Sequence, residues 1–263
     1  MSDLRHTALI TGGSSGIGAA YARQLAKRGF DLILVARRKH RLTEIAEEMR
    51  EQFSCDVTMV VADLANSNDL KRVQDLFETR QDITVLVNNA GVGALGPTAK
   101  VKPSDLENLV KVNVLALTML SVAALSAFRA RGSGLLVNIA SVIALGPSPT
   151  AAGYSGSKAY VLNFSRSLEQ EYAETDVTIQ TILPGPVRSE FFESSGAKPA
   201  FPDELYMTAD MLAETALRAY DMKESVTFPT LPDTTLWVEF EGARKKFYKM
   251  VLTTGKPAQR YGM

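Results

Sequence analysis

The sequence predicts one α/β domain built on a doubly wound parallel β-sheet of about seven strands, with helices on both faces. Short apolar runs without alternation recur along the 263-residue chain, which is typical of strands buried on both faces. Longer amphipathic segments separate these runs, and such an alternation of strands and helices favours a parallel sheet. A glycine-rich turn follows the first run, at the place where folds of this class bind ligands.

The expected strands and helices alternate as far as residue 228. Strands are expected at 7–11, 32–36, 57–62, 83–87, 135–139, 177–183 and, with a weaker pattern, 226–228. Helices are expected at 16–29, 38–53, 67–80, 104–130, 152–173 and 208–222. Seven strands in one sheet make one domain, so we assign residues 1–263 to a single domain with a core at 5–228 and a C-terminal extension at 229–263.

The composition excludes several classes of protein. Lys+Arg and Asp+Glu both number 29, and a net charge of zero lacks the basic excess of a nucleic-acid-binding protein. Two histidines, His6 and His40, and one cysteine, Cys55, are too few for a clustered metal site, and neither histidine is well placed for a Ser-His hydrolase. One cysteine forms no intramolecular disulfide and the polar N-terminus lacks a secretory leader, so we expect a cytoplasmic protein.

The segment 112–128 contains no charged residue and could be mistaken for a membrane span. It is at the short limit for crossing about 30 Å of hydrocarbon, and it holds polar residues such as Asn113 and Thr118. We therefore interpret it as a helix buried within the protein or at a subunit interface, and we expect no integral membrane segment.

The first expected strand ends at Thr11 and runs directly into the glycine-rich turn. Glycines let the backbone approach a ligand closely, and the N-terminus of the following helix offers free N–H groups to a phosphate. This strand–turn–helix context is typical of a Rossmann-type dinucleotide site, and a tight turn without a ligand is the alternative. The candidate cofactor contacts in the turn are Gly12, Ser14, Ser15, Gly16, Ile17 and Gly18.

The end of the second strand indicates which dinucleotide would bind. An Asp or Glu usually holds the 2′,3′-diol there, but this strand ends in Ala36, Arg37 and Arg38. Two guanidinium groups suit a 2′-phosphate, so the sequence favours NADP(H) over NAD(H). Two solvated arginines are the alternative, but arginine at a helix N-terminus opposes the helix dipole.

Tyr154 and Lys158 are four residues apart and would share one face of a helix. An ammonium beside a phenol favours the phenolate, which lowers a tyrosine pKa from about 10 and suits proton exchange with a carbonyl oxygen. Ser141 directly follows the strand that ends near Ala140, at the sheet edge where α/β sites are built. A surface pair and a turn serine are the alternatives for these residues taken singly.

Taken in order, the motifs resemble those of the classical short-chain dehydrogenase/reductase family, in its NADP-preferring type. The resemblance covers about residues 5–228. Beyond the glycine turn, the matching residues are Asp63-Leu64, Asn88-Asn89-Ala90-Gly91, Asn113, Ser141 with Tyr154 thirteen residues later, Lys158, and Pro184-Gly185-Pro186-Val187. Ala36 stands where NAD-preferring members carry Asp, and Arg37 stands where many NADP-preferring members carry Arg.

The resemblance implies a role for each matched position. Tyr154 would be the acid/base, Lys158 would lower its pKa and bind the nicotinamide ribose, and Ser141 would orient the substrate oxygen. Asn113 would hold a water that links Lys158 to solvent. The further cofactor contacts would be Asp63, Leu64, Asn89, Ala90, Gly91, Tyr154, Lys158, Pro184, Gly185, Val187 and Ser189.

The implied activity is hydride transfer between NADP(H) and a carbonyl or secondary alcohol. By analogy with the family, a lid at about 188–207 would cover the substrate. Apolar residues of the lid and of the segment after Ser141 favour a hydrophobic small-molecule substrate, although the lid aromatics also suit a packed core. These residues are Phe191, Phe192, Phe201, Leu205 and Met207, with Val142, Ile143, Leu145 and Pro147. The family also leads us to expect a homodimer or homotetramer.

Two other functions stay open. A non-catalytic, nucleotide-binding regulatory protein of the same fold would have no need of Ser141, Tyr154 and Lys158. A methyltransferase also uses a glycine-rich turn on a parallel sheet, but its cofactor has no phosphate for Arg37 and Arg38.

The extension 229–263 lies beyond these motifs. Apolar residues from Leu236 to Leu252 have the spacing of a helix with one apolar face, and basic residues from Arg244 to Lys249 lie among them. The sequence leaves three interpretations: contact with a membrane surface, closure of a neighbour's pocket, or packing on the sheet or a partner subunit.

Overall fold

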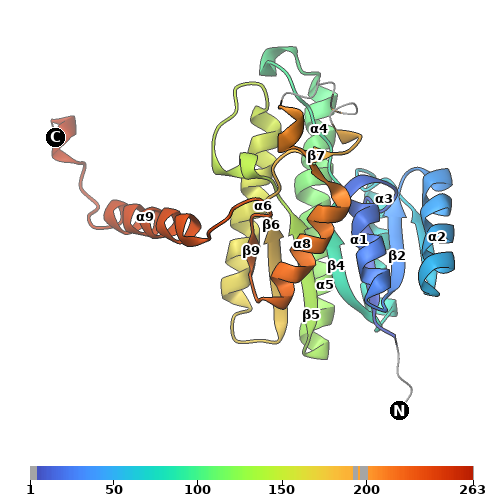
Figure 1. The fold of residues 1–263 in the computed structure, drawn as a ribbon. Helices are drawn as coiled ribbons and strands as arrows, with labels where there is room; N and C mark the ends of the chain where they lie inside the picture. The colour runs from blue at the N-terminus through green and yellow to red at the C-terminus, as the bar shows by residue number, and fades with distance from the viewer. Residues whose placement is uncertain (1–4, 192–194, 196–200, 263) are drawn as a thin grey trace. The chain divides into compact units, whose positions relative to one another are not determined.

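The computed structural model describes residues 5–191, 195 and 201–262. The chain divides into two compact units, Met1–Pro229 and Thr230–Met263 (Figure 1). The first unit contains every sequence motif, and the second contains one long helix. The assignment of the whole chain to a single domain stays a prediction.

A seven-stranded parallel sheet forms the middle of the first unit, with the order β3-β2-β1-β4-β5-β6-β9. Its strands are β1 (Thr7–Thr11), β2 (Asp31–Ala36), β3 (Val57–Val61), β4 (Ile83–Asn88), β5 (Gly134–Ile139), β6 (Val177–Ile182) and β9 (Val226–Thr227). Strand order reverses between β1 and β4, and ligands of open α/β sheets bind at the carboxyl ends beside such a point. The predicted fold class is confirmed.

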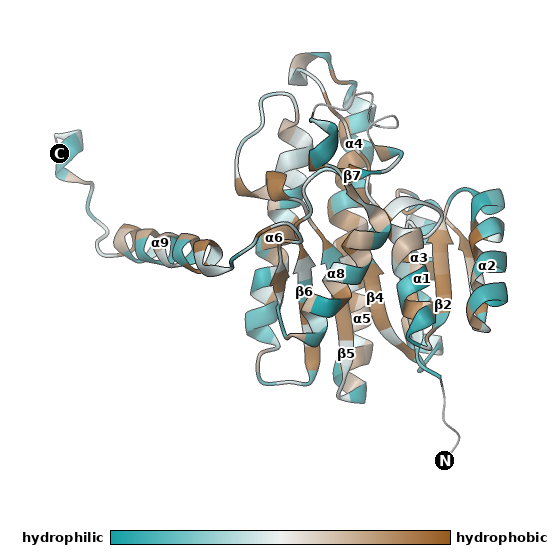
Figure 2. Cartoon of the chain, in the orientation of Figure 1, coloured by the Kyte–Doolittle hydropathy of each residue, from teal (hydrophilic) through white to brown (hydrophobic). Residues whose placement is uncertain are grey.

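Helices cover both faces of this sheet, and each face has its own apolar core. On one side pack α1 (Gly16–Lys27), α2 (Lys39–Phe53) and α8 (Ala209–Asp221), and on the other α3 (Ser67–Thr79), α5 (Leu117–Arg131) and α6 (Ala152–Glu171). Successive side chains of a strand point to opposite faces, so Ile10 joins the first core and Leu9 the second. Figure 2 shows the apolar strands between these helix layers.

The edge strand β3 departs from the expectation that both faces are covered. Met59 and Val61 on this strand are 36% and 42% exposed. β3 pairs only with β2 and ends the sheet, so fewer neighbours are available to cover its side chains.

The uncharged segment lies in one helical stretch that runs from α4 (Pro103–Val110) through a π-helical part, η2 (Lys111–Ala116), into α5. The stretch 103–131 is long and apolar enough to cross a membrane by length and composition, and half of its most apolar window is buried inside the fold. Leu120, Ala124 and Phe128 from it belong to the core below α3 and α5. It packs within the protein as expected, and the absence of an integral membrane segment stays a prediction.

Several short elements have no clear pattern in the sequence. They are the 3₁₀ turns η1 (Thr98–Lys100), η3 (Val142–Leu145), η4 (Asp203–Leu205) and η5 (Gln259–Tyr261), and a two-stranded sheet of β7 (Val187–Arg188) and β8 (Met207–Thr208). The second unit holds the helix α9 (Thr235–Val251), where the apolar spacing predicts one.

Replacing Phe128 by Ala should lower the free energy of unfolding by about 3–5 kcal/mol, because a buried ring is lost and a cavity remains. Phe128 is fully buried and meets Phe77 edge-on, with 6.3 Å between ring centres. Urea unfolding of the full chain measures the change. The exposed Arg129→Ala on the same helix should stay within about 0.5 kcal/mol of the parent; equal losses in the two variants would contradict this packing.

Candidate active site

The residues singled out in the sequence follow the carboxyl ends of neighbouring strands. The glycine turn follows β1, the motif at 88–91 ends β4, Ser141 follows β5, and Pro184 follows β6. These strands lie next to one another in the sheet, so the structure brings the motifs to one edge, beside the reversal of strand order.

The glycine turn has a shape that only glycine allows at key positions. Gly12 and Gly16 have φ values of +66° and +53°, in the left-handed region. A Cβ atom on Gly18 would lie 2.2 Å from the carbonyl oxygen of Gly12. The Ser15 side chain does not cap α1, and the first turn of the helix holds no acidic residue. The turn therefore leaves a helix N-terminus open to an anionic group.

The Thr11 hydroxyl joins this turn to the motif after β4. Its Oγ1 donates to the Val87 carbonyl at 3.2 Å and accepts from the N–H groups of Asn89 and Ala90, each at 3.0 Å. The Asn89 amide in turn donates to the carbonyls of Thr11 and Gly12, at 2.9 and 3.3 Å. Thr11 was not among the predicted contacts; a hydroxyl at the strand end directly before the glycines is the signal for it.

The two arginines after β2 have different surroundings. Arg37 is exposed and forms no hydrogen bond or ion pair with the residues that the structure describes. The Arg38 guanidinium donates to Ser15 Oγ at 2.9 Å and pairs with Glu190 at 2.8 Å. Arg38 also holds the pKa of Glu190 below its usual range. Arg38 therefore bridges the glycine turn to a carboxylate of the segment after β7, a partner that no sequence motif indicated.

Asp63 and Leu64 lie in the turn between β3 and α3. The Asp63 N–H donates to the Asp69 carboxylate at 2.8 Å, and its own Oδ1 accepts from the Ala65 N–H at 3.0 Å. Leu64 is buried in the core below α3. The pair is thus held in place by local hydrogen bonds next to β2, the strand that Arg37 follows.

Ser141, Tyr154 and Lys158 come together as their spacing predicts. Tyr154 and Lys158 lie one turn apart on α6, and the Ser141 hydroxyl lies close enough to the Tyr154 phenol to influence its pKa. The Lys158 ammonium donates to the Ile139 carbonyl at 2.7 Å and lies 5.8 Å from the centre of the Tyr154 ring. Three groups able to hold an oxygen, exchange a proton and carry positive charge thus share one site.

Burial controls the pKa values in this cluster. It raises the pKa of Tyr154 above its usual range, while the neighbouring Ser141 hydroxyl acts in the opposite direction. It lowers the pKa of Lys158 to about 8. The expected lowering of the Tyr154 pKa by Lys158 is not seen in this arrangement, where desolvation of the phenol is the largest influence on that pKa. The Phe191 ring, with its centre 5.1 Å from that of Tyr154, contributes to this covering.

Asn113 lies in the π-helical segment η2 and is buried. Its Oδ1 accepts from the Val92 N–H at 2.8 Å, and its Nδ2 donates to the Val92 carbonyl at 2.9 Å and to Ser157 Oγ at 3.2 Å. A Cβ on Gly91 would lie 3.5 Å from Asn113 Oδ1 and 3.8 Å from Lys158 Nζ. Asn113 and Lys158 therefore approach the same glycine, and π-helical turns are frequent at functional sites.

Ser157 is a contact that the motifs did not indicate. Its hydroxyl donates to the Tyr154 carbonyl at 2.7 Å and accepts from Asn113, so it links the two helices that carry them. The only signal in the sequence is a serine three residues after Tyr154, and this spacing is too common to predict that Ser157 links the two helices.

The segment after β6 returns to the glycine turn. Pro184 is buried and accepts a hydrogen bond from Ser141 at 3.4 Å, and Val187 is buried in β7. A Cβ on Gly16 would lie 3.3 Å from Ser189 Cβ, so Ser189 lies against the turn. Gly185 lies between these positions, and the predicted contacts of the segment therefore line the same edge.

The expected lid residues do not converge as a group. Phe191 packs on Tyr154, but Phe201 meets Tyr206, with 6.3 Å between ring centres, and is half-exposed. Leu205 is exposed, whereas Met207 packs on the core. Phe192 lies outside the described residues.

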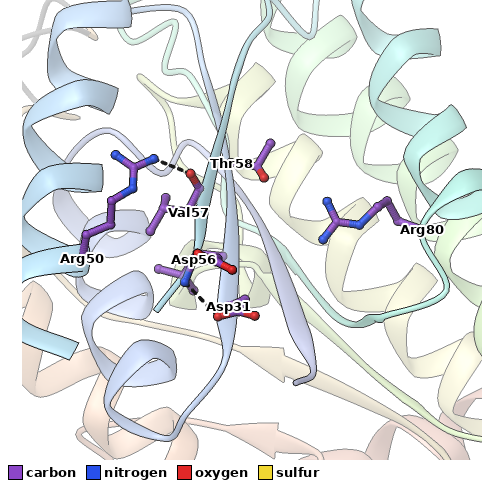
Figure 3. A pocket seen from close by; sticks show the side chains of 7 residues that line it. Asp31, Arg50, Asp56, Val57, Thr58 and Arg80 are labelled. Carbon is purple, nitrogen blue, oxygen red and sulfur yellow. Dashed lines mark hydrogen bonds between the residues drawn. The ribbon is translucent and has the colours of Figure 1, made fainter. Parts of the chain in front are cut away.

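A separate pocket lies at the opposite edge of the sheet, where β2 and β3 begin (Figure 3). Three of its four charged side chains already have partners within the fold: Arg50 donates to the Val57 carbonyl, Asp31 accepts from the Asp56 N–H, and Arg80 pairs with an aspartate. We therefore assign it no ligand. Among the described residues, no three His, Cys, Asp or Glu gather as a metal site, and the absence of a metal stays a prediction.

Comparison with known proteins agrees with this arrangement. A family model described as short chain dehydrogenase matches residues 6–200. A short-chain dehydrogenase from Sphingobium yanoikuyae, solved in complex with NADPH, is 36% identical, with a TM-score of 0.93 over 97% of this chain and 100% of that chain. The "bulky-bulky ketone specific alcohol dehydrogenase" from Comamonas testosteroni is 34% identical, with a TM-score of 0.88 over 97% of this chain and 98% of that chain.

A curated relative is longer than this chain. The very-long-chain 3-oxoacyl-CoA reductase of Anas platyrhynchos is 33% identical over 199 residues, which are 74% of this chain and 63% of that protein. This chain thus covers less than two thirds of that relative's length.

The buried Lys158 should make stability rise with pH between about 8 and 10.5. Its pKa is lower in the folded state than in the unfolded state, so the unfolded chain binds more protons in this window and the penalty on the buried ammonium disappears as pH rises. A shift of this size corresponds to about 3 kcal/mol. Urea unfolding of the parent and of Lys158→Met across this pH range isolates the effect as the difference between them. A constant difference would contradict the lowered pKa.

Proposed function

Because the chain belongs to the short-chain dehydrogenase family, we propose that it is an NADP(H)-dependent oxidoreductase that interconverts a hydrophobic carbonyl compound and its alcohol. One observation carries the proposal: Ser141, Tyr154 and Lys158 meet beside an open, glycine-built helix N-terminus. A nucleotide-binding protein needs the open helix N-terminus, but only a proton-transfer catalyst needs the cluster of Ser141, Tyr154 and Lys158.

The residues present fit NADP(H). The turn from Gly12 to Gly18 has the conformation and the free helix N-terminus that a pyrophosphate requires. Arg37 carries an unengaged guanidinium at the end of β2, where no carboxylate is available for a 2′-hydroxyl. The Sphingobium relative is described with NADPH bound, which supports the same choice here. When bound, this cofactor supplies or accepts the hydride.

The side chains provide the proton and the positioning. In the reducing direction, the Tyr154 hydroxyl gives its proton to the carbonyl oxygen as hydride reaches the carbonyl carbon, and Ser141 holds that oxygen. The raised pKa keeps Tyr154 protonated at neutral pH, which is the form this step needs. Lys158 would hold the nicotinamide ribose and, with Asn113, would return a proton from solvent to Tyr154. Carbonyl compound, NADPH and one proton thus give the alcohol and NADP⁺.

Apolar side chains around the cluster favour a hydrophobic substrate. Val142 and Leu145, in the 3₁₀ turn after Ser141, are exposed although they are apolar, and Phe191 covers Tyr154. Pockets for small molecules combine such apolar walls with a few polar groups. The Comamonas relative is named for bulky ketones, which supports a ketone with two large apolar substituents as the substrate class.

We extend the proposal to a cytoplasmic homodimer or homotetramer. The outer face of η2 and α5 exposes Leu115, Met119 and Val122, and the hydroxyl of the exposed Tyr160 on α6 lies 2.8 Å from that of Thr118. Exposed apolar side chains gathered on adjacent helices are typical of a subunit interface. The single cysteine, Cys55, is buried and free, in agreement with a reducing compartment.

Replacing Tyr154 by Phe should reduce turnover of a ketone with NADPH by at least about 10²-fold, because the proton donor is lost. NADPH affinity should stay within a few-fold, since the ring and its packing on Phe191 remain. Steady-state kinetics together with a fluorescence titration of NADPH separate the two effects. Unchanged turnover would reject Tyr154 as the acid, and full NADPH binding without any turnover in the parent would favour the non-catalytic alternative.

The cofactor preference should depend on Arg37. We expect NADPH to bind more tightly than NADH, and Arg37→Ala to weaken NADPH about 10- to 100-fold while NADH changes little, because one charge-assisted contact to the 2′-phosphate is lost. Glu190→Gln should tighten NADPH about two- to fivefold, since an exposed ion pair on Arg38 no longer competes with the phosphate.

The control for Glu190→Gln is Asp203→Asn. Asp203 pairs with Arg188 at 3.4 Å, so the variant removes an exposed carboxylate from the same segment without touching Arg38. Its NADPH affinity should equal that of the parent. A preference for NADH in the parent would overturn the choice of cofactor and leave the oxidoreductase class intact.

Ketones with two large apolar substituents should have kcat/KM values at least about tenfold above those of sugars and of acetone-sized ketones. Two extra methylene groups buried in an apolar pocket contribute about 1.6 kcal/mol, which is slightly more than tenfold. A panel of ketones assayed with NADPH measures the trend. Faster turnover of polyols would contradict the apolar pocket.

A further inference from the structure

Helix α9 presents an apolar face that its own unit leaves exposed. Positions 236, 240, 243, 247 and 250 recur at alternating steps of four and three, which places them on one side of a helix. The large side chains on or beside this face are Leu236 (63% exposed), Phe240 (46%), Phe247 (73%), Met250 (63%) and Val251 (61%). Figure 2 shows apolar and polar residues interleaved along the helix, as such a face requires.

The same part of the chain is strongly basic. From Gly242 to the C-terminus there are six basic residues and no acidic one: Arg244, Lys245, Lys246, Lys249, Lys256 and Arg260. The whole chain is neutral, so this excess is confined to the tail. Arg244 pairs with Glu241 at 2.9 Å, but Lys245, Lys246 and Lys249 form no ion pair with the described residues. The helix that carries the apolar face therefore also carries three lysines without an ion-pair partner among the described residues.

We propose that α9 docks on an anionic lipid surface, with its apolar face in the headgroup region and its lysines on lipid phosphates. A basic helix with aromatic and aliphatic residues on one side has the composition of an interfacial helix, and each lysine near an anionic leaflet adds to its attraction. A second copy of α9 is a poorer occupant, because it carries the same basic excess and would repel the first copy, whereas an anionic surface attracts it. The proposal concerns binding alone and does not depend on the proposed reaction.

The chain carries its own probe of this binding. Trp237 is the only tryptophan, it lies on α9, and its ring stacks on that of Phe240 with 5.7 Å between centres. Transfer of an indole from water to the headgroup region shifts its emission to shorter wavelength. Every change in tryptophan fluorescence therefore reports on this helix.

The test titrates the full chain with vesicles of phosphatidylcholine containing phosphatidylglycerol, and with vesicles of phosphatidylcholine alone. We expect a blue shift and co-sedimentation with the anionic vesicles, at least tenfold weaker binding to the neutral ones, and loss of binding as salt rises. Phe247→Asp, and Lys245→Glu combined with Lys246→Glu, should each weaken binding at least tenfold.

The matched control is Val238→Asp. Val238 is 65% exposed on the opposite side of α9, so the same aspartate there should leave binding within about twofold. Equal losses in the two aspartate variants, or no binding of the parent to anionic vesicles, would overturn the proposal. Sedimentation in the absence of lipid tests whether the face instead binds a second copy of the chain. That alternative holds if the parent does not bind vesicles and if Phe247→Asp dissociates an oligomer that Val238→Asp leaves intact.

Discussion

The hydrogen bonds of the Thr11 hydroxyl hold together the edge of the sheet at which the sequence motifs meet. This hydroxyl joins the end of β1 to the backbone of Asn89 and Ala90 after β4, across the point where strand order reverses. Because the Asn89 amide returns to the carbonyls of Thr11 and Gly12, the glycine turn is fixed from both sides. The conformation of the glycine turn before α1 thus results from a closed set of hydrogen bonds between the ends of β1 and β4.

Burial makes the cluster of Ser141, Tyr154 and Lys158 an unfavourable place for charged groups. Lys158 is buried with one backbone carbonyl as its partner, and its lowered pKa is the sign that this position is unfavourable for an ammonium. Tyr154 is shifted in the other direction by the same loss of water. A site that left the Lys158 ammonium in water would be more stable, but the ammonium would then exchange its proton less readily near neutral pH.

All seven strands and six of the long helices follow from the sequence, because strands buried on both faces produce uninterrupted apolar runs and helices between them show a clear period. The grouping of Ser141, Tyr154 and Lys158 was predictable as well, since strand ends and helical spacing determine it. Ser157, Glu190 and the covering of Tyr154 by Phe191 were not, because each depends on how two distant segments meet. The shift in the Tyr154 pKa was misjudged for the same reason: spacing along α6 says nothing about the ring that covers the phenol.

The exposed edge strand β3 makes the chain susceptible to aggregation before it has folded. Its sequence from Val57 to Val61 is uncharged, rich in β-branched residues and free of proline, and no strand among the residues that the structure describes pairs with its outer edge. Such a segment readily stacks with copies of itself when a chain is newly made or partly unfolded. Asp56 and Asp63 flank it, and charges in these positions oppose that stacking. The two aspartates therefore lower the tendency of β3 to aggregate, which is independent of any role at the sheet edge that holds Ser141.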